Sequence, residues 1–194
     1  MASKLKTDIL ETGSGSGTIA LNNQLSGMTS ASVPSGSVLQ VVSATMKDTA
    51  VITSSSTNTF VALGIEAVIT PISTSSKILI EVSVMSAHTL GTLHFRLARG
   101  GDETICIGDA GLSNQIRSTT STRNSATPYA HNMVVVPITF LDSPVTTSAT
   151  TYSVKGTIGL SYNGIMYINR PTNGSNADYD PRGTSTITLT EING

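Results

Sequence analysis

The sequence predicts an all-β protein, an antiparallel β-sandwich preceded by an extended N-terminal arm. Of the 194 residues, 27 are Ser and 29 are Thr, and only 12% are charged. Thr favours strands, whereas Ser, Gly and Asn favour turns. Several stretches also alternate apolar and polar side chains at the two-residue period of a half-buried strand, and polar turns separate them. Helical segments rich in Leu, Glu, Lys and Ala are almost absent from the sequence.

Residues 1–35 form the predicted arm. They are rich in Gly, Ser, Thr and Asn, and "SVPSGS" at 32–37 reads as a hinge before a domain spanning 36–194. Such a segment cannot bury enough apolar surface to offset its ordering entropy. We therefore expect other protein chains to hold it through its scattered apolar residues Leu5, Ile9, Leu10, Ile19 and Leu21.

The domain should begin with five strands, at 38–44, 59–70, 77–85, 92–99 and 102–108. The first is rich in the β-branched residue Val, and the next three each place apolar side chains on one face. These core candidates are Val61, Leu63, Ile65, Ala67, Ile69, Ile78, Ile80, Val82, Val84, Leu93, Phe95 and Leu97. Gly100-Gly101 predicts a two-residue hairpin between the fourth and fifth strands.

Four more strands are expected at 133–141, 151–161, 165–170 and 185–192. The first is apolar on both faces, and Pro137 predicts an edge strand or a bulge there. Asn163-Gly164 predicts a type I′ hairpin between the next two. Tyr152, Val154, Ile158, Leu160, Ile187 and Leu189 should face the core. Nine alternating strands with polar turns favour a jelly-roll-like sandwich.

Two long irregular stretches remain, at roughly 109–131 and 171–184. Loops of this length in a compact domain are usually functional or lie at an interface. Aromatic and Arg side chains dominate recognition surfaces. The candidate receptor-contact or subunit-contact residues are therefore Arg117, Arg123, Tyr129, His131, Tyr179 and Arg182, with solvated loop residues as the alternative.

The Gly-rich stretch "ETGSGSGTIALNNQLSG" at 11–27 superficially resembles a phosphate-binding loop. No Gly-Lys-Ser/Thr follows, and neither a preceding strand nor a following helix is expected. A flexible tether explains it better.

No other pattern predicts catalysis, a cofactor or a metal. Asn176, Asp178 and Asp180 have the alternate spacing of a calcium loop, but Pro181 and Ile187 replace its required Gly and acid. An Asx-rich turn explains them better. His88, His94 and His131 lack metal-ligand spacing, and His94 is expected at the surface. The single cysteine, Cys106, is expected to be a small core residue.

The charge and hydropathy of the sequence indicate which kinds of partner the chain does not bind. The net charge of −1 predicts no nucleic-acid binding. No apolar run approaches the length of a membrane span, and "MASKLKTDIL" lacks the apolar stretch of a secretory signal. We expect neither membrane insertion nor export by that route.

Several motifs together resemble a domain of bacteriophage tail-fibre and related virion proteins, including those of phages with marine and cyanobacterial hosts. They are "LDSPVTTSATTYSVKGTI", "GIMYINR" and "GTSTITLTEI", with "GSVLQVV", "ITPISTSSKILIEVSV" and "FRLARGGDETI" before them, and the tether "LKTDILETGSGSGTIALNN". The resemblance implies a virion structural protein, usually a homotrimer, with its N-terminus joined to the particle and its β domain facing outward. It supplies no catalytic residues.

The leading hypothesis is therefore a non-enzymatic fibre or fibre-like appendage on the exterior of a phage particle. Its partners would be other virion proteins, further copies of itself, and a host surface glycan or protein. A capsid-decorating (cement) protein is the alternative. A polysaccharide-degrading enzyme ranks lower, because only 12 acidic residues exist and several lie in the tether or in turns. A lectin also ranks lower, because of the long N-terminal arm.

Overall fold

The protein is described here from a computed structural model, which covers residues 33–53, 59–89, 91–109, 111–123, 131–159 and 164–194. The arm, including Leu5, Ile9, Leu10, Ile19 and Leu21, lies outside these residues. Eleven strands and no helix occur in the described ranges, so they contain no helix that could cross a membrane. The prediction of an all-β protein is confirmed.

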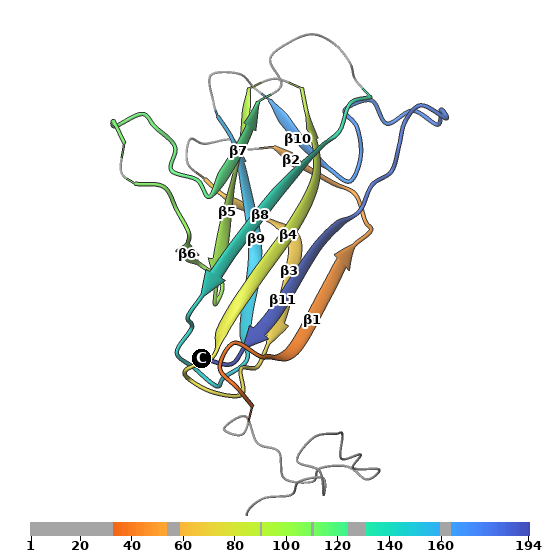
Figure 1. Ribbon diagram of the computed structural model, residues 1–194. Helices are drawn as coiled ribbons and strands as arrows, with labels where there is room; N and C mark the ends of the chain where they lie inside the picture. The colour runs from red at the N-terminus through yellow and green to blue at the C-terminus, as the bar shows by residue number, and fades with distance from the viewer. Residues whose placement is uncertain (1–32, 54–58, 90, 110, 124–130, 160–163) are drawn as a thin grey trace, which may run out of the picture. The chain divides into compact units, whose positions relative to one another are not determined.

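The strands form two antiparallel sheets, packed face to face (Figure 1). The first sheet contains β1 (Val38–Met46), β2 (Ala50–Thr53), β4 (Lys77–His88), β8 (Val134–Asp142), β10 (Ile165–Ile168) and β11 (Ser185–Ile192). The second contains β3 (Val61–Ile69), β5 (Thr92–Arg99), β6 (Glu103–Ile105), β7 (Thr120–Arg123) and β9 (Thr150–Ile158).

The core lies between the sheets and consists of the alternate side chains that the sequence placed inward. Phe95, Ile80 and Leu189 are fully buried, as are most other predicted core residues. The exception among those described is Val61, which is 38% exposed at the start of β3. Burial at every second residue thus specifies which face of each strand meets the opposite sheet.

The first and last strands pair. β1 runs antiparallel to β11, with Val38 opposite Ile192 and Met46 opposite Ser185. Beyond them, Gly36 N donates to Asn193 O at 2.7 Å and Asn193 N donates to Ser37 O at 2.9 Å. The chain therefore enters and leaves the domain at the same end, where the C-terminus is marked in Figure 1.

Three turn or strand predictions need correction. β9 and β10 do not form the hairpin predicted from Asn163-Gly164, because β9 pairs with β3 and β5 while β10 pairs with β2 and β4 in the other sheet. The hairpin at Gly100-Gly101 exists, but Arg99 pairs with Glu103, so its loop has three residues. Strands β2 and β7 were missed, because each has only four residues and their Ser- and Thr-rich surroundings resemble loops.

The structure corrects the prediction for Cys106 and agrees with the one for Pro137. Cys106 is half-buried just beyond β6, with a φ of 53°, and does not belong to the core. Pro137 lies on β8, which pairs only with β4 in the part of the chain that the structure describes. The prediction of an edge strand around Pro137 is thereby confirmed.

A polar cluster connects the two sheets near the ends of β5 and β8. Tyr152 OH on β9 donates to Asp142 Oδ2 on β8 at 2.7 Å, and Arg99 Nη1 on β5 donates to the same carboxylate at 2.8 and 3.0 Å. Arg99 also forms a two-bond contact with Glu103. The hydrogen bonds to Glu103, followed by those to Asp142, raise the pKa of Arg99. Burial and the neighbouring Asp142 raise the pKa of Tyr152.

We expect Tyr152→Phe to lower the free energy of unfolding by about 1–2 kcal/mol, because a buried hydrogen bond to a carboxylate is lost. Urea titration of the full chain measures the change. Tyr167→Phe is the matched control: the Tyr167 hydroxyl makes no hydrogen bond to the described residues, and its ring is only half-buried. Equal losses in the two variants would contradict a role for the Tyr152 hydroxyl.

Candidate functional site

Two of the predicted loops meet at the end of the domain opposite Pro34 and Asn193. β11 begins beside the end of β1, and β8 begins at Val134, which pairs with Ser86 near the end of β4. The residues that precede these two strands therefore lie at the same end (Figure 1). Here the structure brings together His131, from the first loop, with Tyr179 and Asp180, from the second.

A hydrogen-bonded pair connects the loops. His131 Nδ1 lies 2.5 Å from Asp180 Oδ1. The Tyr179 ring packs edge-to-face against the His131 ring, with 4.7 Å between centroids and an interplanar angle of 78°. The Asp180 carboxylate is only 2% exposed, whereas Tyr179 is 61% exposed. The buried acid thus orients an imidazole and an aromatic ring that remain accessible.

Asp180 is anchored from its own loop as well. Ser175 Oγ donates to Asp180 Oδ2, and Asp180 N donates to Ala177 O at 3.1 Å, closing a tight turn. The hydrogen bonds from Ser175 and then from His131 lower the pKa of Asp180. These contacts favour the ionised carboxylate, which accepts hydrogen bonds from both sides.

The contacts do not form a nucleophilic triad. In such a triad the serine hydroxyl donates to the imidazole, and the acid binds the other ring nitrogen. Here the Ser175 hydroxyl donates to the acid itself, so the imidazole does not activate it. The described residues also contain no group of three or more His, Cys, Asp or Glu side chains that could hold a metal ion. The arrangement can position a binding surface.

Arg117 lies in a second cluster, on the outer face of the β3-β9-β5 sheet. Arg117 Nε donates to Gly108 O at 2.7 Å, and Arg96 Nε donates to the carbonyl of Arg117 at 2.8 Å. The Arg96 guanidinium stacks on Phe60, with Cζ 3.8 Å from the ring centroid. Burial, and then the charge of Arg117, lower the pKa of Arg96. Arg96 was missed because nothing in the sequence links it to Phe60 and Arg117.

His94 lies near this cluster, and its burial differs from the prediction. It was predicted at the surface but is half-buried, and its Nδ1 has no hydrogen-bond partner in the described part of the chain. Burial, and then the charge of Arg96, lower the pKa of His94.

The remaining predicted contact residues do not join either cluster. Arg123 ends β7, opposite Thr92, and is exposed. Arg182 is also exposed, between Asp180 and the start of β11. Tyr129 lies outside the described residues. The pairing of His131 with Asp180 had no sequence signal, because 49 residues separate them.

No protein-family model matches this chain, and no curated protein matches it significantly.

We expect Asp180→Asn to loosen the contact between the two loops at neutral pH. The pKa of Asp180 is lower in the folded protein than its ordinary value of 3.8. The stabilisation is therefore present above pH 3.8 and is lost as the pH falls through the folded-state pKa. Amide hydrogen exchange in residues 175–182 should be faster in the variant at pH 7, and the difference should vanish in acid.

Asp178→Asn provides the control, because Asp178 is an exposed acid on the same loop. Its exchange rates should match those of the parent protein at every pH. Unchanged exchange in Asp180→Asn at neutral pH would show that the carboxylate does not hold the loops together.

Proposed function

We propose that this protein is a non-enzymatic structural protein of a bacteriophage virion, a fibre or fibre-like appendage. Residues 1–35 anchor it to other virion proteins, and the β domain faces outward as part of a homo-oligomer. The motifs that resemble phage tail-fibre proteins first suggested this function.

One observation carries the proposal: the point at which the arm joins the domain and the loops that contain His131 and Tyr179 lie at opposite ends of the domain. The arm joins the domain at Pro34, next to Asn193. The loops that contain His131 and Tyr179 project from the other end, beyond the starts of β8 and β11. A protein that attaches at one end and contacts the host at the other needs this polarity.

The surface chemistry agrees with an exposed position on a particle. The outward-facing positions of β11 carry Thr186, Thr188 and Thr190, which alternate with buried residues. Uncharged polar groups keep such a surface hydrated without a strong electrostatic field. The exposed Tyr179 beside His131 supplies the aromatic character that recognition surfaces favour.

The orientation can be measured on particles that carry the protein. A label attached at residue 194 should appear close to the particle surface, and a label at Asn176 should appear farther out, by about 30 Å for a nine-residue strand. Cryo-electron microscopy would locate both labels. Labels at equal distances from the particle surface, or in the reverse order, would contradict the proposed attachment. Both labels lying against the capsid shell would favour the cement protein.

Host contact can be tested separately at the far end. His131→Ala with Tyr179→Ala should reduce adsorption of particles to the host, because the accessible rings are removed, while the melting temperature changes little. Val51→Ala is a suitable control, since Val51 is an exposed apolar residue on β2 and belongs to neither of the two loops. Undiminished adsorption of the double variant would remove this loop surface from the proposal.

A further inference from the structure

One side of the sandwich is open. Among the described residues, β1 pairs only with β11 and β3 pairs only with β9, so each is an edge strand. The two edge strands belong to opposite sheets and lie next to each other on this side of the domain. Unpaired edges expose backbone N–H and C=O groups that can accept another strand.

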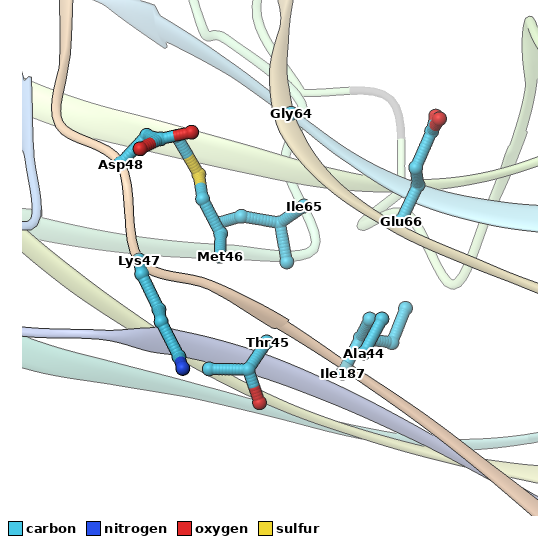
Figure 2. A pocket seen from close by; sticks show the side chains of 9 residues that line it. All are labelled: Ala44, Thr45, Met46, Lys47, Asp48, Gly64, Ile65, Glu66 and Ile187. Carbon is cyan, nitrogen blue, oxygen red and sulfur yellow. The ribbon is translucent and has the colours of Figure 1, made fainter.

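A groove of 540 Å³ lies between these edges. Its apolar lining consists of Ala44, Met46, Ile65 and Ile187, and its polar and backbone lining of Thr45, Lys47, Asp48, Gly64 and Glu66 (Figure 2). The groove therefore combines an apolar interior with a hydrophilic rim.

The core is incomplete beside this groove. Val42, Ala44 and Met46 point inward from β1 but are only partly buried. Inward side chains of the other strands, such as Ile80, Phe95 and Leu189, have 0% exposure. An apolar segment laid along β1 would bury the partly exposed residues and continue the core.

The two edges are not equivalent as acceptors. The β3 ladder shifts register between Ala62 and Glu66, and Gly64 lies in this irregularity with a φ of 78°. Bulges of this kind protect an edge from further pairing. The β1 ladder is regular from Gln40 to Met46. A new strand can therefore pair with β1 and extend the β1-β11-β4 sheet.

The opening is confined to part of β1. At the start of the strand, Gln40 Nε2 donates to Thr70 O at 2.8 Å and to Glu191 Oε2 at 2.5 Å. Ile72 N donates to the other oxygen of Glu191 at 2.7 Å. These bonds close the gap between β1 and the β3–β4 connection, so the acceptor edge runs from Val41 to Met46.

We propose that residues 17–25 of a second copy of this chain occupy the groove as an added antiparallel strand. The stretch "GTIALNNQL" carries no charge, so no ion would be buried. Ile19 and Leu21 alternate with Thr18, Ala20 and Asn22, which suits a strand with one face in the groove. Strand addition of this kind is an established mode of protein recognition.

The position of the arm supports this occupant. The described domain begins four residues before β1, and 33 residues precede Pro34. The eight residues between Leu25 and Pro34 can span about 27 Å when extended, enough to reach a neighbouring molecule. The inference rests on the proposed function, in which copies of this chain form a homo-oligomer, and it names a surface at which two copies connect.

Disulfide trapping on the full chain tests the pairing. In a Cys106→Ser background, one tagged chain carries Ser43→Cys, on the outer side of β1, and a second chain with a different tag carries one cysteine in the arm. After co-expression and oxidation, disulfides between the two tags are detected on a non-reducing gel. Of cysteines at 20, 22 and 24, the one that lies opposite Ser43 should cross-link, because a disulfide joins Cα atoms less than about 7 Å apart. Cysteine at 19, 21 or 23 should not cross-link, because those side chains enter the groove.

Ser121→Cys, equally exposed on β7 of the other sheet, is the control acceptor and should not cross-link. A cross-link between tags that is confined to one of the even-numbered positions and specific for Ser43→Cys supports the proposal. Absence of cross-links, equal cross-linking to Ser121→Cys, or disulfides formed only within one chain would overturn it. This result is independent of the label positions on particles, so either idea can fail alone.

A second measurement does not depend on cysteines. Ala44→Lys places a charge in the groove, whereas Ser43→Lys, its neighbour, points away from it. The oligomeric mass of the full chain should fall in Ala44→Lys and remain unchanged in Ser43→Lys. Unchanged mass in a folded Ala44→Lys variant would overturn the proposal.

Discussion

The pairing of β1 with β11 determines how the domain is organised. It joins the first strand to the last along their whole length, which places Pro34 beside Asn193. Because β11 occupies one edge of β1, the other edge is left without a partner in the described chain. The closeness of Pro34 to Asn193, the start of β11 at the other end of the domain and the open side all follow from this one antiparallel ladder.

The core and the polar contacts between sheets have different roles. Apolar side chains from both sheets fill the interior and supply most of the stabilisation, since burial of apolar surface is the dominant favourable term in folding. Directional contacts such as Tyr152 with Asp142 then restrict how the sheets can shift against each other. The Asp142 carboxylate can be buried between the sheets because both of its oxygens accept hydrogen bonds, which offset the cost of removing the charge from water.

The core residues of this protein could be predicted from its sequence, whereas the pairing of its strands could not, for a physical reason. Phe95, Ile80 and Leu189 were identified correctly because burial repeats every two residues within a single strand. Strand partners were harder to predict. Asn163-Gly164 has the local chemistry of a tight hairpin, yet β9 and β10 belong to different sheets. Local turn preference was overridden by packing.

The sequence by itself determined that this protein is an all-β sandwich and which residues face its core, although β7 interrupts the stretch 109–131 that was predicted to be irregular. Those properties depend on neighbours close in the chain. Only the tertiary structure decided that His131 meets Asp180, that Arg96 stacks on Phe60 near Arg117, and that Ala44 and Met46 line an open groove with Ile65. These contacts join segments that are distant in sequence, and no local pattern encodes which of many Ser-, Thr- and Asn-rich loops will meet.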